Sequence, residues 1–531
     1  MEGTRNAQLP DMDALPRMTV RRDESLPKLA WYAVIDRQAD TCDVEVGRFV
    51  EVDPAPAPRW VVSGFWNGDF VAGNFHTAEH FFGSGLRLDE DEVVVATAHT
   101  MIERVVYARE GNQLHVSNSL VVLLGRTGAR LNPAADHRRW SESSCLGVHN
   151  YIRQFSVVHP RLEVMSQLVF EAMHLDTKGE ASFRTHDLPH TFTSFNDYLG
   201  QMTSALRTMW SNATDPRRVR PMRAVSSASR GYDSSTVVAL VQPIVGQPLL
   251  TWSSERSNTR VPGFVQKLMK AELTDDDGSE IARHLGADPR HLDLDESHVP
   301  AEMEAWFWAS SQSSPELLFH SLFREADTHD VPTVWFAGHG GDGAWGVDLP
   351  TIKLANQLIR ASPSGVSMNE ARAQFGVIEC SPAFIFSRSV NSLHRVTMSE
   401  ELAPWRLNNG YDRPIPRRIL EERGVPRSDF GWGKKAVAED MESPRGGELR
   451  EMFFKRTHWS RVLESLYRNV NLALYLSSRA LTLIQQRGSR AKMLLNSGRG
   501  DGKHRFERWV DLQKSTFLMT TDWLASRYAR G

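Results

Sequence analysis

The sequence predicts an α/β protein with a sheet-rich N-terminal domain followed by a larger domain built on a parallel sheet. Short β-type runs separated by Gly, Asn and Asp fill residues 30–190, and strand-like and helix-like runs alternate after residue 190. Such alternation is typical of βαβ units, whose strands pair in parallel. The length of 531 residues, at about 100 to 200 residues per domain, favours two or three domains. We therefore predict one domain over residues 1–190 and another over residues 191–531.

In the N-terminal domain, β-type residues dominate the apolar runs 31–35 (WYAVI), 93–98 (VVVATA) and 114–124 (LHVSNSLVVLL). Valine, isoleucine and aromatic residues favour strands, so we expect a strand in each run. Residues 192–210 then place apolar side chains at helical spacing, and the polar segment 211–221 interrupts that pattern. This change of pattern places the domain boundary near residue 190.

In the C-terminal domain, strands are expected at 222–227, 249–254 and 331–338, and helices at 234–244, 279–286 and 317–326. The last ninety residues are mainly helical in pattern, with an amphipathic block over residues 458–484 and a basic loop over residues 487–508.

Charge and composition exclude several classes of function. Lys plus Arg total 62 against 65 Asp plus Glu, so the net charge of -3 provides no global positive field for nucleic acid or anionic lipid. The longest apolar stretch, 237–250, is too short to cross a bilayer and contains two prolines. The three cysteines fit neither a disulfide framework nor a zinc site, and the first thirty residues resemble no export signal. We expect a cytoplasmic protein with no membrane span and no nucleic-acid partner.

The segment from Ser229 to Ser235 (SRGYDSS) joins a β-type run to a helical run. A turn of Ser and Gly lets main-chain N–H groups approach an anion, and the positive end of the next helix favours negative charge. Ser229, Ser234 and Ser235 add hydroxyl donors, while Asp233 suits a Mg²⁺ ion between carboxylate and phosphate. The alternative is a plain strand-to-helix turn with Asp233 as its N-cap.

This segment resembles the pyrophosphate loop Ser-Gly-Gly-x-Asp-Ser-Ser of asparagine synthetases, which cleave ATP between its α- and β-phosphates. The resemblance implies an ATP site whose residues are Ser229, Arg230, Gly231, Asp233, Ser234 and Ser235. Arg230 replaces the usual glycine, so its side chain either hinders the approach of the phosphates or binds them.

A second glycine-rich segment, from Trp335 to Gly346, again follows a β-type run. Two such turns at strand ends would meet on one edge of a parallel sheet, where ligands of open α/β folds bind. The segment resembles the Gly-Glu-Gly-x-Asp-Glu motif of the same family. The resemblance implies nucleotide contacts at Gly338, Gly340 and Gly341, and makes Asp342 the second carboxylate for Mg²⁺ and pyrophosphate.

Differences inside this motif indicate the reaction. His339 replaces the first glutamate and Gly343 the last, and the resulting Gly-His-Gly-Gly-Asp resembles lasso-peptide macrolactam cyclases. These enzymes join an amine to an adenylated side-chain carboxylate. An imidazole with an ordinary pKa of about 6.5 is a suitable base for the attacking amine.

Two further sites follow from the same resemblance. Residues 411–427 read as a helix that starts at a proline and is closed by Gly424, and they are followed by Lys434 and Lys435. The family places a lysine in this region beside the reacting centre, where it would stabilise developing negative charge. Ser253, at the end of the run 249–254, is the expected contact with the adenine and ribose.

Residues 105–124 resemble the glutaminase half of asparagine synthetases. The implied folds are an Ntn αββα sandwich for residues 1–190 and an adenine-nucleotide α-hydrolase-like synthetase domain for residues 191–531. Glutaminases of this class use an N-terminal cysteine, but Glu2 follows Met1 and Cys42 is internal. We expect no glutamine hydrolysis.

The resemblance as a whole implies an ATP-dependent, AMP-forming amide ligase, with macrolactam closure of a lasso-type ribosomal peptide as the favoured reaction. Its partners would be a substrate carrying the carboxylate and the amine, and a leader peptidase or leader-binding protein. Two alternatives are a small-metabolite ligase similar to β-lactam synthetases and a non-catalytic scaffold. A tRNA-modifying relative is disfavoured by the net charge of -3.

Overall fold

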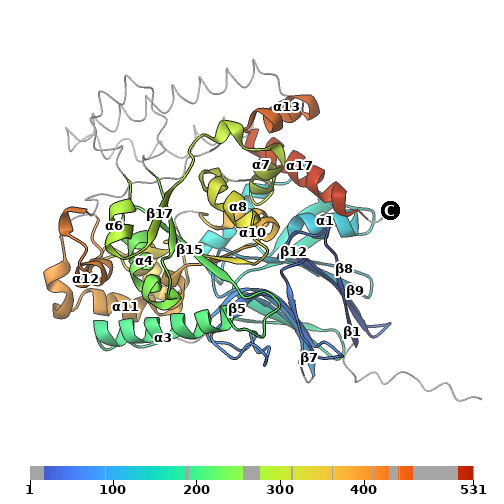
Figure 1. Cartoon of the computed structure of the whole chain (residues 1–531). Coiled ribbons are helices and arrows are strands. Elements are labelled where there is room, and N and C mark those ends of the chain that lie inside the picture. Colours follow the sequence, from blue (N-terminus) through green and yellow to red (C-terminus); the bar gives the residue numbers. More distant parts are fainter. Residues whose placement is uncertain are drawn as a thin grey trace, which may run out of the picture.

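The structure is a computed structural model that describes residues 17–89, 91–185, 190–254, 276–312, 315–360, 363–408, 411–429, 441, 443–457 and 512–529. It is a mixed α/β structure, with a sheet-rich N-terminal region and a parallel sheet in the C-terminal region. Figure 1 shows the N-terminal sheets in blue and cyan beside the green strands of the third sheet.

The first sheet consists of β1 (Arg17–Arg22), β2 (Trp31–Asp36), β3 (Thr41–Val46), β8 (Val105–Glu110), β9 (Gln113–Ser117), β10 (Arg130–Leu131), β11 (Gln154–Val158) and β12 (Val164–Leu168). Its strand order is β1-β3-β2-β9-β8-β12-β11-β10. β1 runs parallel to β3, and the other neighbours are antiparallel.

The second sheet consists of β4 (Glu51–Val52), β5 (Trp60–Trp66), β6 (Phe81–Leu88), β7 (Glu92–Thr97), β13 (Glu171–Asp176) and β14 (Ala181–Thr185). Its neighbours, in the order β14-β13-β7-β6-β5-β4, are all antiparallel. Trp31 and Ile35 of the first sheet share one buried cluster with Val61, Leu86 and Met173 of the second. Burial of these apolar faces against each other holds the two sheets together.

The run 114–124 is only half strand, which corrects the prediction for that segment. β9 ends at Ser117, and the helix α1 (Leu120–Thr127) follows. The Ser119 side chain accepts a hydrogen bond from the Val122 N–H and caps the helix. Because residues 120–125 are buried all round, their apolar run lacks the alternation that separates a strand from a helix. The runs 31–35 and 93–98 do form strands, in β2 and β7.

The third sheet consists of β15 (Arg223–Ala228), β16 (Leu250–Ser253), β17 (Asp288–His291), β18 (Thr333–Phe336) and β19 (Val377–Cys380). Its order is β17-β16-β15-β18-β19 and every pair is parallel, which confirms the predicted parallel sheet. The chain proceeds from β15 outward to β17 and then returns to place β18 on the other side of β15. The order therefore reverses between β15 and β18, the position at which open α/β sheets bind ligands.

The remaining α-helices are α2 (His137–Ser141), α3 (Phe195–Ala213), α4 (Tyr232–Val245), α6 (Ser279–His284), α7 (Ala301–Trp308), α8 (His320–Asp327), α9 (Gly341–Ala344), α10 (Asn369–Phe375), α11 (Val390–Thr397), α12 (Pro414–Glu422), α13 (Gly447–Arg456) and α17 (Leu512–Ala525). Short 3₁₀ helices cover Ser143–Leu146, Glu296–His298, Leu317–Phe319, Lys353–Ala355, Val366–Met368, Pro382–Phe384, Ser387–Ser389, Glu400–Trp405, Arg427–Asp429 and Ser526–Tyr528. The helices expected near 192–210, 234–244, 279–286 and 317–326 are present as α3, α4, α6 and α8. α12 begins at a proline, as predicted.

One buried cluster crosses from the first region to the second. It joins Val106 and Leu123 to Trp306, Phe323 and Trp335. α17 also packs against α1 and α7, so the C-terminal helix returns to the N-terminal sheets (Figure 1). The predicted boundary near residue 190 falls between β14, which ends at Thr185, and α3, which begins at Phe195. The regions on its two sides nevertheless share a core.

No helix among the described residues is both long and apolar enough to cross a membrane. The amphipathic block 458–484 and the basic loop 487–508 lie outside the described residues.

Candidate active site

The loop after β15 is shaped by hydroxyl groups of its own segment. The Ser229 N–H donates to Ser234 Oγ at 3.0 Å, and the Gly231 N–H donates to Ser229 Oγ at 3.1 Å. Ser235 Oγ donates to the Ser229 carbonyl oxygen at 2.6 Å. These bonds fold the loop back onto the first turn of α4. The three serines predicted to bind phosphate therefore also determine the shape of the loop.

Asp233 lies in the first turn of α4, and Gly231, not Asp233, is the N-cap. The cap makes no side-chain hydrogen bond to the helix. The N-terminus of a helix combines main-chain N–H donors with the positive end of the helix dipole, so it favours an anion. Gly231 therefore occupies the capping position that the alternative assigned to Asp233, and the plain strand-to-helix turn is otherwise untested.

Arg230 points its guanidinium at main-chain carbonyls of a different segment. Its Nε donates to the Asp429 oxygen at 3.1 Å, and its Nη2 lies 3.5 Å from the Ser428 oxygen. Its main-chain N–H donates to the Asp276 oxygen at 3.3 Å. Arg230 thus ties the loop after β15 to the segment that follows α12.

The loop after β18 passes directly over the first turn of α4, and glycines make this approach possible. A Cβ atom at Gly338 would lie 2.7 Å from the Ser234 nitrogen, and one at Gly341 would lie 2.5 Å from Cγ of Asp233. Gly340 has a φ of +82°, a conformation that other residues rarely adopt. Asp342 lies in the first turn of α9 directly after this contact. The structure therefore brings together the two loops that the sequence singled out.

Tyr411 and Arg413, whose roles the sequence did not predict, complete this part of the site. Arg413 Nε lies 3.7 Å from Asp233 Oδ1, and its side chain is only 11% exposed. Tyr411 accepts a hydrogen bond from the Tyr232 N–H at 3.3 Å, and the two tyrosine rings stack at 5.1 Å. Both residues precede α12, in the segment that the sequence had singled out only for the lysines after it.

His339 is enclosed by two buried glutamates. Its Nδ1 lies 2.5 Å from Glu379 Oε1, and its Nε2 lies 3.5 Å from Glu316 Oε1. The Ser381 hydroxyl donates to the His339 carbonyl oxygen, and the Trp335 ring meets the imidazole edge-on at 5.6 Å. Both ring nitrogens therefore face carboxylates.

This environment differs from the one assumed for His339 at the sequence level. Burial alone would lower the pKa of His339, but Glu379 and Glu316 outweigh burial and raise the pKa to about 10. The same contacts keep the pKa of Glu316 and Glu379 below the usual range, although burial works against ionisation of both. Near neutral pH His339 is a cation and a hydrogen-bond donor. The ordinary imidazole pKa on which the general-base role rested does not apply here.

Glu316 and Glu379 are the functional candidates that the sequence reasoning missed. Glu379 is the lone charged residue of β19 (VIEC) and is fully buried. A buried acid in a short apolar strand needs a partner for its charge. The glutamate in the run VIEC is therefore the sequence signal that could have identified Glu379 as a candidate. Its partner lies 40 residues earlier in the chain.

Ser253 is fully buried at the end of β16. Its hydroxyl donates to Asp277 Oδ1 at 3.0 Å and accepts from the Gly278 N–H at 2.8 Å. The side chain therefore organises the start of α6, and a nucleotide contact at Ser253 stays a prediction. Lys434 and Lys435 lie outside the described residues.

Two kinds of metal site can be compared with the carboxylates of Asp233 and Asp342: one built from protein ligands alone, and one in which phosphate oxygens share the ion. The second kind fits these two residues better. Among the described residues, no group of three or more His, Cys, Asp or Glu side chains could hold a metal ion. Mg²⁺ typically takes one or two carboxylates and completes its octahedron with phosphate oxygens and water. Asp233 and Asp342 lie in the first turns of α4 and α9, at the ends of two adjoining loops, and would supply two carboxylates to such an ion.

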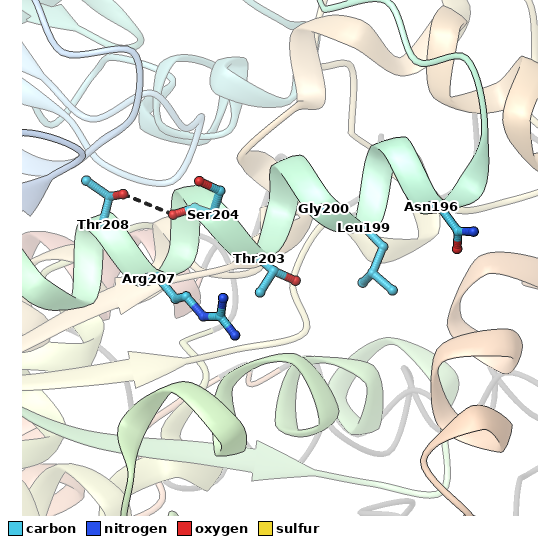
Figure 2. A pocket seen from close by; sticks show the side chains of 7 residues that line it. All are labelled: Asn196, Leu199, Gly200, Thr203, Ser204, Arg207 and Thr208. Atoms are coloured by element: carbon cyan, nitrogen blue, oxygen red, sulfur yellow. Dashed lines mark hydrogen bonds between the residues drawn. The ribbon is translucent and has the colours of Figure 1, made fainter.

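A hollow of about 430 Å³ lies elsewhere on the surface, along one face of α3. Figure 2 shows the side chains that line it, which are Asn196, Leu199, Gly200, Thr203, Ser204, Arg207 and Thr208. None of them belongs to the loops after β15 or β18. This hollow is separate from the site built on Asp233 and His339.

Comparison with models of known protein families gave no match, and no curated protein matched the sequence.

Proposed function

We propose that the chain is an ATP-dependent amide ligase that forms an acyl-adenylate and releases AMP and pyrophosphate. The observation that carries the proposal is the contact between the two glycine-rich loops, Gly341 against Asp233, at the point where the order of the parallel sheet reverses. The first loop leads into the N-terminus of α4, which favours phosphate groups.

In this proposal ATP is a substrate, and its phosphates lie along the first turn of α4 beside Ser229, Ser234 and Arg413. Asp233 and Asp342 would hold Mg²⁺, which when bound supplies positive charge to the phosphate oxygens. Gly338 lets the loop after β18 pack closely on the first turn of α4, where a Cβ atom would lie 2.7 Å from the Ser234 nitrogen. The three free cysteines, Cys42, Cys145 and Cys380, fit a reducing compartment that contains ATP, and we propose the cytoplasm.

The reaction has two steps. A substrate carboxylate oxygen attacks the α-phosphorus of ATP, and the bond to pyrophosphate breaks. An amine nitrogen then attacks the acyl carbon and releases a proton to water, and the bond to AMP breaks as the amide forms. His339 in its cationic form directs its two ring N–H groups at Glu379 and Glu316. It can accept the amine proton only after it has released one of its own.

Within this class we propose that both reacting groups belong to one peptide, so that the product is a macrolactam. The Gly-His-Gly-Gly-Asp form of the second motif supports this choice. Holding the amine beside the adenylate makes the attack intramolecular, which favours closure over hydrolysis. A small-metabolite ligase remains the rival, and the substrate that supports adenylation separates the two.

The test is ATP–pyrophosphate exchange with Mg²⁺, run with candidate peptides and with small amino acids that carry a second carboxylate. We expect exchange that depends on one substrate class and falls at least about 100-fold in Asp233→Ala and Asp342→Ala. Asp288→Ala is the matched control, because Asp288 begins β17 at the opposite edge of the sheet and is 49% exposed. Exchange that survives both site substitutions would overturn the proposal, as would an absence of Mg-ATP binding in calorimetry.

A further inference from the structure

Arg372 on α10 stands at the junction of the two regions, directly behind Glu379. Its guanidinium is 3% exposed. Nη1 donates to Glu379 Oε2 at 2.9 Å and to the Gly365 carbonyl oxygen at 2.5 Å. Nη2 donates to the Ile102 carbonyl oxygen at 2.7 Å. One guanidinium thus contacts the partner of His339 and the main chain of the N-terminal region.

Glu379 bridges two cations, one on each carboxylate oxygen. Oε1 meets His339 Nδ1 at 2.5 Å, while Oε2 accepts from Arg372. A planar guanidinium fixes the orientation of a carboxylate better than a single point charge does. Without Arg372, one oxygen of a fully buried carboxylate would lose its donor, and the carboxylate would be free to turn away from the imidazole.

The N-terminal region holds Arg372 from its other side. Glu103 Oε1 lies 4.0 Å from Arg372 Nε, and Ile102 approaches so closely that a Cβ at Gly365 would lie 2.9 Å from its side chain. The helix that carries Arg372 is fixed to the same region a second time, because Glu370 accepts the Leu120 N–H at 2.8 Å. Residues that precede the predicted boundary therefore help to fix α10, together with α7, α8 and β19, on which the helix packs.

We propose that Arg372 is a positioning residue through which the N-terminal region holds the Glu379 carboxylate against His339. The inference deepens the proposed function, on which its catalytic readout rests, by giving the N-terminal region a part in the same site. The groups that face His339 and its partners are Glu316, Glu379, Arg372 and, behind Arg372, Glu103.

A positioning role and a purely electrostatic role predict opposite shifts for His339. Removal of a nearby positive charge by itself raises the pKa of an imidazole. Loss of the carboxylate that faces Nδ1 lowers it. The direction of the shift after Arg372 is replaced therefore separates the two roles, and it requires no enzymatic activity.

The experiment uses the full-length chain labelled with [¹⁵N]histidine, with His339 assigned through His339→Gln. The ring is titrated by NMR from the ordinary imidazole pKa of about 6.5 to above the value of about 10 that His339 has here. We expect Arg372→Gln to lower the pKa of His339 by about one unit or more, and Arg372→Lys to lower it less. An unchanged or raised pKa in Arg372→Gln overturns the proposal. If Arg372→Gln does not fold, Arg372→Lys decides by the same criterion.

Arg218→Gln is the matched control, because Arg218 is another buried arginine that links the two regions. Its guanidinium donates to the Asn212 carbonyl oxygen at 2.7 Å and to the Gly64 carbonyl oxygen at 3.0 Å. We expect no shift at His339 in this variant, and an equal fall would show general loosening of the junction and overturn the proposal. The catalytic readout is a fall of about tenfold or more in amide formation with Arg372→Gln. If the chain shows no exchange with any substrate, the proposed function fails, while the NMR result still decides the role of Arg372.

Discussion

The loops after β15 and β18 end neighbouring parallel strands, yet different interactions hold them. The first is closed by hydroxyl groups within seven residues of sequence, from Ser229 to Ser235. The second depends on close packing by glycine and on the charge of His339 between Glu316 and Glu379, which come from distant parts of the chain. A loop closed by local bonds can be recognised in the sequence, whereas one held by remote charges can be located but not understood from sequence alone.

The largest change in stability is expected from Glu379→Gln, which removes one of the two anions that hold the loop after β18. It leaves a buried imidazolium with only Glu316 as its anion, and breaking a buried ion pair from one side typically costs about 3 to 5 kcal/mol. Because the pKa of His339 is raised, its stabilising contribution is complete below the ordinary pKa of about 6.5 and is lost as pH rises towards about 10. We expect the variant to lose less stability than the wild type over this alkaline range, measured by urea unfolding at several pH values.

Glu51→Gln is the control for this prediction. Glu51 is also buried, but its carboxylate accepts from the main-chain N–H groups of Val219 and Arg220 and not from a histidine. An alkaline slope in Glu379→Gln equal to that of the wild type would mean that the His339 pair contributes nothing to the pH dependence.

A smaller effect is expected from Gly341→Ala, which tests the packing of the second loop on the first. The new Cβ would lie 2.5 Å from Asp233 Cγ, so the Asp233 carboxylate must turn away or the loops must separate. Overpacking of this kind costs about 1 to 3 kcal/mol, and we expect Mg-ATP binding to weaken at least about tenfold in calorimetry. Gly343→Ala is the matched control, because a Cβ there meets nothing within 4 Å. Equal affinities in the two variants would contradict the proposed nucleotide site.

The smallest effect is expected from Arg230→Gly, which restores the residue that the resemblance predicts. The variant loses hydrogen bonds to carbonyls of the segment after α12, each contributing about 0.5 to 1.5 kcal/mol. We expect a modest loss of stability in urea unfolding, with any ATP–pyrophosphate exchange retained within about tenfold. A loss of exchange as large as that of Asp233→Ala would instead show that the guanidinium binds phosphate directly.

Much of the fold could be predicted, because strand and helix patterns are local. The alternation after residue 190 correctly indicated a parallel sheet, and the proline at 414 marked the start of α12. The prediction failed at residues 118–124, where a valine-rich run forms a helix because Ser119 and Glu370 satisfy its N-terminus and burial on all sides removes the alternation. Glu370 lies 250 residues from Leu120, so no local pattern could reveal that contact.

The sequence by itself determined where the two loops lie in the chain, which acids they contain and which strand each loop follows. These features depend only on residues that are neighbours along the chain. Tertiary structure alone decided that Gly341 touches Asp233, that Arg413 lies beside the same carboxylate, and that His339 is a cation. The physical reason is that the pKa of a buried group is set by the charges placed around it. Those charges, Glu316, Glu379 and Arg372, reach His339 only after the sheet has formed.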